Sequence, residues 1–508
     1  MSTTVEPLGR RVTDVLAGLR TFVTPDWLAV AAQTDRVIEA LKRHVPEFAT
    51  GQLTLQECAI KRVRLRDGSG YWTGTYRLTV TGLQPGRDQV VAVRARLIPP
   101  GWKGASSAER RVPAAPDEAA PFGAERWRCS VPELRLELET QPPEAELPAL
   151  PVLTDPEEAR LLIERAMRES GPAYADVRIR SCVPQVMRYK PGSRCTIRYR
   201  LEYPAELAAG REWPTIVVAK TYRSDKSENK GQNAFAAMRA LWDSPLGRSR
   251  AVAIAEPLAY LPELNMLLQG PIREETTLKD LIRAALRADT METIAELHDY
   301  MRKTAIGLAE LHRCGVRYGE TVTWHDEFEE VRQRYERLTI PIPQLAGLAA
   351  PLLARLDSLA AAHPADPPQP AHRSFRPAQV LLHTGQIGFI DFDGFCQAEP
   401  AMDLALFMAK VKQTGLSKVD IDEDEADDEV LDEPTRLRRL ARMEAACDLF
   451  LSTYAAHAPV SRQRVVLWEA LDLFALVLGC WTKIKTGRLR DSMLLLERHL
   501  RLNGLDMS

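Results

Sequence analysis

Apolar and polar residues alternate along several short segments in the first half of the chain, and this pattern predicts β-strands. A helix near 26–44 precedes three such segments, at 59–66, 71–80 and 89–98. Apolar residues of the predicted helix recur at the three- and four-residue spacing that places them on one face. We therefore expect one helix followed by three strands in this region.

A second round of the same pattern begins with a predicted helix at 155–169, and three more alternating segments follow it. The two rounds also share letters, because TYRLTV at 75–80 resembles RYRLEY at 198–203. One interpretation is an internal duplication of a helix-plus-three-strand unit. The other is that any two three-stranded meanders look alike, so both interpretations stay open.

From residue 278 onward most apolar residues follow helical spacing. The expected helices are LKDLIRAAL and the segments 293–313, 325–337, 344–361, 435–457 and 461–482. Proline-rich stretches near 99–124, 142–151 and 364–370 interrupt the regular patterns. The chain is thus predicted to be α+β, with a small α/β domain (1–150), a β-rich part (151–270) and a helical part (271–508).

Composition narrows the function classes. The 508 residues are 45% hydrophobic and 27% charged, with a net charge of −2. Near-neutral charge gives no support for a nucleic-acid or membrane partner attracted by bulk electrostatics. The eight cysteines form no CxxC pair, which predicts scattered, reduced thiols. The N-terminus has no apolar core of signal-peptide length, and we expect a cytoplasmic protein.

An acidic run at 420–433 contains ten carboxylate side chains in fourteen residues. Such a run is typical of a solvated, disordered loop. Alternatively, a flexible acidic loop could attract cationic substrates.

The most informative segment is 371–407, AHRSFRPAQVLLHTGQIGFIDFDGFCQAEPAMDLALF. Two short apolar strands, joined by a Thr384-Gly385 turn, follow a polar cluster and deliver an aspartate at the end of the second strand. Its key polar residues are His372, Ser374, Gln379, Asp391 and Asp403. This layout can place a base and metal ligands around one phosphoryl group, and phosphoryl transfer needs little beyond such positioning and charge neutralisation.

The segment resembles the catalytic region of aminoglycoside phosphotransferases and choline-kinase-like enzymes, a branch of the protein-kinase-like fold. Their pattern is H-G-D-x4-N, then I-D, then D-L-A twelve residues after that Asp. The spacing is kept here, with five residues from Ser374 to Gln379 and twelve from Asp391 to Asp403. The base Asp is replaced by Ser374 and the metal-binding Asn by Gln379. The resemblance implies a bilobal protein-kinase-like fold with ATP and Mg²⁺ as cofactors.

The resemblance also assigns roles in the helical part. Asp391 and Gln379 would bind Mg²⁺, because the glutamine carbonyl can still act as an oxygen ligand. His372 would brace the loop, and Asp403 would cap its helix and hold the loop backbone at 372–374. Asp393 is the nearby carboxylate that could replace the lost base. His312 is expected to be a packed, hydrogen-bonded histidine rather than a catalyst.

In the β-rich part, the turn at Gly192 and Ser193 either covers the phosphates with backbone amides or is a plain hairpin turn. Lys220 matches the strand lysine that neutralises the α/β-phosphates, or it is an edge residue. Glu228 would hold this lysine, or it is a solvated cap. Gln269 ends the strand that would recognise adenine through its backbone.

The residue at position 374 determines whether full catalytic activity is expected. A serine hydroxyl cannot accept a substrate proton near neutral pH as a carboxylate can, and general-base assistance is worth roughly 10²–10⁴ in rate. The sequence therefore predicts a phosphotransferase-like ATP-binding protein with impaired catalysis, acting ancestrally on the hydroxyl of an unknown small-molecule acceptor. The acceptor would be cationic if the acidic run attracts it. The alternatives are an active small-molecule kinase that uses another base, and a non-catalytic pseudokinase that binds a protein partner. The first domain, with Arg94 and Arg96 on its third strand, should have no activity of its own.

Overall fold

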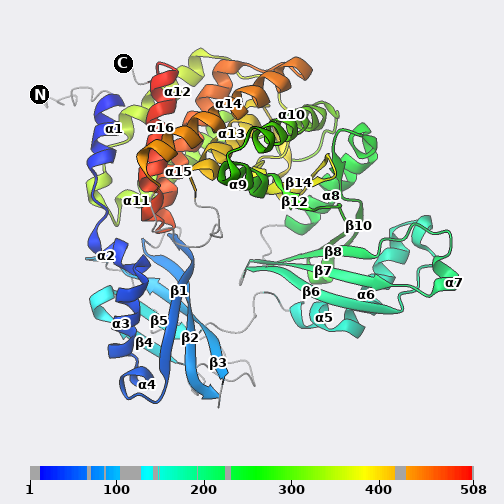
Figure 1. Cartoon of the computed structure of the whole chain (residues 1–508), viewed down its shortest axis with the longest axis horizontal. Helices are drawn as coiled ribbons and strands as arrows, with labels where there is room; N and C mark the ends of the chain where they lie inside the picture. The colour runs from blue at the N-terminus through cyan, green and yellow to red at the C-terminus, as the bar shows by residue number, and fades with distance from the viewer. Residues whose placement is uncertain are drawn as a thin grey trace, which may run out of the picture.

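The computed structural model describes residues 12–65, 70–84, 87–102, 127–140, 147, 149–190, 193–223, 230–417 and 431–505. Two antiparallel sheets of five strands each lie beside a large helical region (Figure 1). The predicted α+β architecture with two lobes and a preceding domain is confirmed. Glu228, Gly192 and most of the acidic run lie outside the described residues.

The first domain comprises helices α1 to α4 and the first sheet. The helices are α1 (Val12–Thr21), α2 (Asp26–Ala29), α3 (Thr34–His44) and α4 (Pro46–Ala49). The strands are β1 (Thr54–Leu65), β2 (Trp72–Gln84), β3 (Arg87–Leu97), β4 (Arg128–Val131) and β5 (Leu136–Thr140). The single helix predicted at 26–44 is wrong, because Gln33 adopts an extended conformation between α2 and α3. The three predicted strands are present as β1 to β3, but the sheet has two further strands, β4 and β5, that the sequence did not predict.

The small lobe comprises the second sheet and its helices. The helices are α5 (Leu150–Thr154), α6 (Pro156–Ser170), α7 (Ala205–Ala208) and α8 (Lys230–Asp243). The strands are β6 (Ser181–Lys190), β7 (Arg194–Glu202), β8 (Ile216–Tyr222), β10 (Pro257–Leu261) and β11 (Met266–Gln269). Here too the sheet has five strands where the sequence predicted a unit of three and a separate linking strand.

The two sheets have the same strand order, β1-β2-β3-β5-β4 in the first and β6-β7-β8-β11-β10 in the second. Tyr76 on β2 and Tyr199 on β7 are both buried. Tyr76 donates to the carbonyl of Ala31 at 2.7 Å, and Tyr199 donates to that of Leu153 at 2.9 Å. The tyrosines that the sequence aligned thus make the same kind of contact to the segment preceding each sheet.

The last hairpin of each sheet repeats the same turn. A Pro-Glu-Leu 3-10 turn connects the strands at 132–134 and again at 262–264. The residue that follows is left-handed in both, with φ of 53° at Arg135 and 42° at Asn265. These matching turns and strand orders favour the duplication over a chance likeness of two meanders.

The shared register relates one residue of the first domain to the predicted phosphate lysine. Arg96 on β3 lies opposite Thr73, and Lys220 on β8 lies opposite Thr196. Arg96 forms an ion pair within its own sheet, because its guanidinium lies 3.4 Å from the carboxylate of Glu139. Arg96 thus occupies the position in the first sheet that Lys220 occupies in the second.

The helical lobe contains eight helices of the described chain and several short strands. The helices are α9 (Leu278–Ala288), α10 (Met291–Arg313), α11 (Trp324–Thr339), α12 (Ala350–Ala362), α13 (Ala401–Leu416), α14 (Glu433–His457), α15 (Arg462–Thr482) and α16 (Leu489–Leu502). The short strands are β9 (Ala253–Ile254), β12 (Thr276–Thr277), β13 (Gln369–Ala371), β14 (Val380–His383), β15 (Gln386–Phe389) and β16 (Cys396–Ala398). Strands β14 and β15 form the antiparallel hairpin that the sequence predicted.

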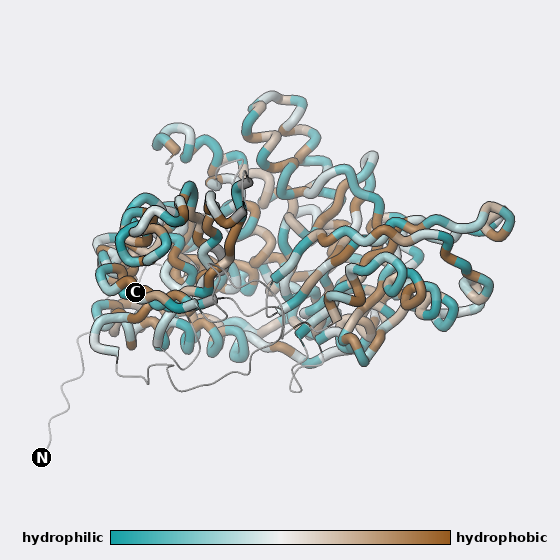
Figure 2. Tube along the Cα trace, turned by 90° about the horizontal axis from the view of Figure 1, so that it is seen from below, coloured by the Kyte–Doolittle hydropathy of each residue, from teal (hydrophilic) through white to brown (hydrophobic). Residues whose placement is uncertain are grey.

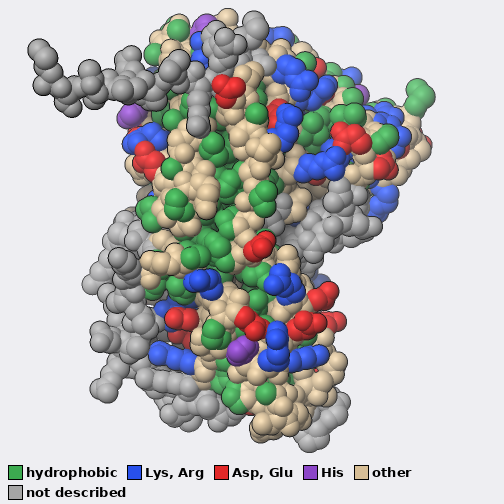
Figure 3. Space-filling model, turned by 90° about the vertical axis from the view of Figure 1, so that its left-hand side faces the viewer, with side chains coloured by type: hydrophobic (Ala, Val, Ile, Leu, Met, Phe, Trp, Pro, Cys, Tyr) green, Lys and Arg blue, Asp and Glu red, His purple; other side chains and the backbone are tan. Residues whose placement is uncertain are grey.

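The first domain shares one hydrophobic core with the helical lobe, whereas the sheet of the small lobe has a core of its own. At the junction the indole N–H of Trp72 donates to the carbonyl of Trp481 at 3.0 Å. The ring of Phe22 packs edge-on against Trp481. Hydrophobic side chains also occupy the middle of the outer face that the first domain and the helical lobe share (Figure 3).

Figure 2 shows hydrophobic positions along the strands and on inward-facing parts of the helices, with hydrophilic positions at the outer turns. Among the described residues, α15 is the one single helix long and apolar enough to cross a membrane. Of its apolar window 67% is buried inside the molecule. Burial of this kind is what a core helix requires.

Candidate active site

The predicted catalytic segment begins where β13 leads into a buried loop. His372 is fully buried, and its Nε2 lies 3.0 Å from the carbonyl oxygen of Ile390 at the end of β15. The backbone N–H of His372 donates to Asp403 Oδ2 at 2.6 Å. His372 therefore braces the loop against the β14–β15 hairpin, as the sequence predicted.

Asp403 lies on α13 and holds two partners in the core of the helical lobe. Besides the loop N–H, its Oδ2 is 3.2 Å from His312 Nε2. His312 in turn contacts the Tyr454 hydroxyl at 2.7 Å through Nδ1. The predicted capping role of Asp403 is wrong, since the N-cap of α13 is Pro400 and no side chain bonds there. The aspartate lies inside the first turn and points to the loop instead.

Ser374, at the position of the family's base, contacts an imidazole and an amide. Its Oγ is 3.4 Å from His372 Nδ1, and the Gln379 amide nitrogen donates to it at 3.3 Å. The same amide nitrogen donates to Asp391 Oδ2 at 3.2 Å. Ser374, Gln379 and Asp391 are therefore close neighbours, as the spacing of the motif implied.

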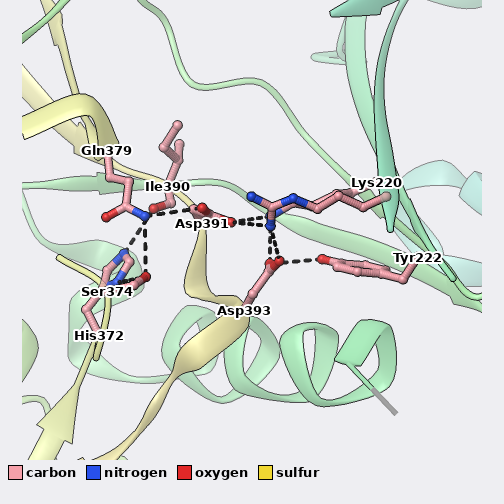
Figure 4. A network of polar contacts seen from close by, with 9 residues as sticks. Lys220, Tyr222, His372, Ser374, Gln379, Ile390, Asp391 and Asp393 are labelled. Atoms are coloured by element: carbon pink, nitrogen blue, oxygen red, sulfur yellow. Dashed lines mark hydrogen bonds and ion pairs between the residues drawn. The ribbon is translucent and has the colours of Figure 1, made fainter. Parts of the chain in front are cut away.

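Two carboxylates follow β15 and face the small lobe (Figure 4). Lys220 Nζ contacts Asp391 Oδ1 and lies 2.6 Å from Asp393 Oδ1. Arg194 Nη1 lies 2.7 Å from Asp393 Oδ2 and 3.4 Å from Asp391 Oδ1. The Tyr222 hydroxyl donates to Asp393 Oδ1 at 2.9 Å. The predicted phosphate lysine and the predicted metal aspartate thus meet in one ion cluster.

The cluster is largely shielded from solvent, since the side chains of its four charged members are at most 20% exposed. Burial would raise the pKa of Asp391, but the charges of Lys220 and Arg194 hold that pKa well below its usual range. Burial and the Asp393 carboxylate raise the pKa of Tyr222 well above its ordinary value. Asp391 is therefore ionised at neutral pH, and the tyrosine stays a hydrogen-bond donor.

Asp391 also has an unusual backbone. Its φ of 75° lies in the left-handed region, which a residue other than glycine seldom adopts. Such conformations cost of order 1–3 kcal/mol and cluster at functional sites. The conformation at the end of β15 turns the chain so that Asp391 and Asp393 both face the small lobe.

The donor set at this position fits a divalent cation such as Mg²⁺. Gln379 Oε1 is buried and has no hydrogen-bond partner among the described residues. The amide nitrogen of the same side chain donates to Asp391 Oδ2 at 3.2 Å, and Lys220 joins Asp391 to Asp393. Hard cations prefer carboxylate and amide oxygens. A search for three or more clustered His, Cys, Asp or Glu ligands finds no metal site in the described chain. Any metal here would combine the two aspartates with the Gln379 amide, turned so that its oxygen rather than its nitrogen faces Asp391.

The remaining predicted site residues make no side-chain contact with the ion cluster among the described residues. Ser193 closes a tight turn, because its N–H donates to the carbonyl of Lys190 at 3.0 Å. Gln269 ends β11 opposite Val218 on β8, where its backbone continues the sheet. No glutamate occurs in α8, so among the described residues the carboxylates that pair with Lys220 are Asp391 and Asp393.

Arg194 and Tyr222 were not predicted as site residues. A signal for both was available, because side chains two apart on a strand share a face, and Tyr222 is two residues beyond Lys220. Arg194 lies directly opposite Tyr222 in the β7–β8 register. A register built from the predicted hairpin would have placed all three side chains together.

About half of the chain matches a known protein family. Residues 211–461 match a family described as the phosphotransferase enzyme family. A search of curated proteins finds no match.

Several solved structures resemble the chain at low identity. A choline/ethanolamine kinase family protein from Mesorhizobium loti is 13% identical with a TM-score of 0.42, covering 68% of this chain and 99% of its own. A choline kinase from Cryptosporidium parvum is 11% identical with a TM-score of 0.44, covering 68% and 97%. A glucosamine kinase is 15% identical with a TM-score of 0.43, covering 95% and 99%.

The family match spans β8, the braced loop and the β14–β15 hairpin, which together carry the predicted lysine, glutamine and aspartate. The two-lobed α+β architecture fits the bilobal fold that the motif implied. Residues 211–461, just under half of the chain, therefore resemble the phosphotransferase enzyme family.

Proposed function

We propose that the protein binds Mg·ATP between its small lobe and its helical lobe and that its phosphoryl transfer is impaired. The single observation that carries this proposal is the meeting of Lys220 with Asp391 across the two lobes. In this family's chemistry the lysine neutralises phosphates and the aspartate binds the metal. Gln379 has a buried, unpartnered carbonyl oxygen and an amide nitrogen that donates to Asp391, so that turning the amide over would supply the second metal ligand.

The impairment rests on the surroundings of Ser374. Its hydroxyl contacts His372 and Gln379, and neither is a carboxylate. A metal ion bound at Asp391 would supply charge neutralisation to the phosphates, but proton removal from the acceptor hydroxyl would lack its usual base. Transfer would then be slower by the roughly 10²–10⁴ that general-base assistance supplies.

The alternative to an impaired phosphotransferase is an active one that uses Asp393 as its base. Asp393 already accepts from Lys220, Arg194 and Tyr222. In Figure 4 it lies on the side of Asp391 that faces Tyr222, whereas Ser374 lies beside His372 and Gln379. Both oxygens of Asp393 are therefore occupied by donors of the small lobe, and this geometry favours the impaired protein.

A thermal-shift titration with Mg·ATP tests the proposal. At about 100 times its dissociation constant, the ligand should stabilise the fold by roughly 2.7 kcal/mol. Lys220→Ala and Asp391→Ala should each remove most of this shift. Arg198→Ala is the matched control, because Arg198 lies on β7 and bonds to Gln185 rather than to the cluster. No shift in the wild type at millimolar Mg·ATP would refute nucleotide binding and favour a non-catalytic partner protein.

A further inference from the structure

Three donors of the small lobe close on the two carboxylates where a divalent cation would bind. Asp393 accepts from Arg194 at 2.7 Å, from Lys220 at 2.6 Å and from Tyr222 at 2.9 Å. Asp391 accepts from Lys220 and lies 3.4 Å from Arg194. All three donors lie on β7 and β8, whereas both acceptors follow β15 of the helical lobe.

The charges of this cluster cancel. Lys220 and Arg194 contribute two positive charges, and Asp391 and Asp393 contribute two negative ones. A dication that approached would meet a site with no net charge, and it would have to displace cations from the oxygens it needs. At short range and low exposure such displacement is costly, because charges there are poorly screened by water.

Lys220 has a role in the chemistry of the family, whereas Arg194 does not. Lys220 has the position of the phosphate lysine, and a bound nucleotide would offer it new partners. Arg194 has no such place in the motif, and its guanidinium bridges both carboxylates. Arginine keeps its charge at any physiological pH and matches carboxylates geometrically. It can therefore occupy the place of a metal ion as long as the two lobes stay together.

We propose that Arg194 is a built-in competitor of the divalent cation, a latch that joins the lobes and lowers the affinity of the carboxylate pair for metal. This inference rests on the proposed metal and nucleotide site and adds its regulation. Metal binds only when the Arg194 guanidinium leaves Asp391 and Asp393. The latch thus couples metal entry to separation of β7 from the loop after β15.

The test measures Mn²⁺ binding without nucleotide, since Mn²⁺ suits oxygen ligands and its free form is counted by electron paramagnetic resonance. Arg194→Gln should bind Mn²⁺ at least tenfold more tightly than the wild type, which corresponds to about 1.4 kcal/mol. Arg198→Gln removes the same charge from the same strand, four residues away, and should bind Mn²⁺ like the wild type. Adding Asp391→Asn to Arg194→Gln should abolish the gain.

Equal Mn²⁺ affinity in Arg194→Gln, Arg198→Gln and the wild type would overturn the latch. A gain that survives Asp391→Asn would also overturn it, because the metal would then bind elsewhere. Arg194→Met keeps the aliphatic stem and replaces the glutamine variant if that variant does not fold. The assay contains no nucleotide, so it is independent of the Mg·ATP titration. A tenfold gain in Mn²⁺ affinity without any Mg·ATP shift would refute the nucleotide site and leave the latch standing.

Discussion

Asp403 fixes the backbone of His372: its Oδ2 accepts the His372 N–H at 2.6 Å, although the two residues are 31 positions apart. Asp403 is fully buried, and His312 shares the same oxygen. Removing a buried charge from its partners is costly, and breaking such a pair typically costs 3–5 kcal/mol. We therefore expect Asp403→Ala to destabilise the helical lobe by about 3 kcal/mol.

The matched control is Asp403→Asn, which keeps an oxygen that can accept from the His372 backbone. It should lose less stability than the alanine variant in chemical unfolding followed by circular dichroism. Equal losses in the two variants would mean that the charge toward His312, rather than the bond to the loop, carries the effect.

The second prediction concerns Trp72, which is fully buried between the first domain and the helical lobe. Trp72→Ala should cost about 3–5 kcal/mol, the usual range for deleting a buried aromatic ring. Because the two regions share one core, amide hydrogen exchange should accelerate in α15 and α16 as well as in β2.

Trp213→Ala is the control, because Trp213 belongs to the separate core of the small lobe. Faster exchange should then appear in β6 to β8 and leave α15 and α16 unchanged. If Trp72→Ala disturbed the first domain alone, the shared core would not be a cooperative unit.

The third prediction is a pH dependence at Asp391, whose pKa is lower in the folded protein than in the unfolded chain. A carboxyl of this kind stabilises the fold fully above its unfolded pKa of about 3.9, and the stabilisation is lost as the pH falls toward the folded pKa. The difference in thermal midpoint between the wild type and Asp391→Asn should be constant from about pH 7 to 5 and shrink below about pH 4. A difference that grows on acidification would mean that burial outweighs the two cations.

The segment 371–407 could be predicted in detail because its contacts are local. His372 reaches Ile390 within one hairpin, and the spacing from Asp391 to Asp403 spans one turn and one helix start. Such distances along the chain are short enough for residue spacing to determine which side chains meet.

The partners of Asp393 could not be predicted in the same way. Arg194 and Tyr222 are 199 and 171 residues away along the chain. Their meeting depends on how two lobes close, and no local pattern encodes that closure. The strand register predicts that Arg194 on β7 and Lys220 on β8 share a face, but it does not predict that Asp393 is their acceptor.

The missed hairpin at 128–140 shows a different limit. Its strands are short and follow a long proline-rich stretch, so alternation alone gave little signal. The likeness of VPELRLEL at 131–138 to LPELNMLL at 261–268 was a usable signal. The same repeat would have predicted the five-stranded order of both sheets.

The last prediction depends on the side chain at residue 374. Ser374→Asp places a carboxylate beside His372 and Gln379, where the family's base stands, and leaves Asp391 and Lys220 unchanged. Any transfer of the ATP γ-phosphoryl group to water or an acceptor should rise, by up to the roughly 10²–10⁴ that general-base assistance supplies. Release of ADP in a coupled assay measures the gain.

Gln379→Asn is the companion change at the same loop, and it should alter the rate less, because both amides offer a metal one carbonyl oxygen. Ser374→Asp alone gains no activity if the charge cluster keeps the nucleotide out of the site. The double variant Ser374→Asp, Arg194→Gln tests this, because opening the cluster should then reveal the increase in rate. A wild type that already turns over at the 1–100 per second typical of kinases would contradict the lost-base argument. Asp393 would then have to leave Lys220, Arg194 and Tyr222 to serve as the base, and Asp393→Asn would abolish the activity.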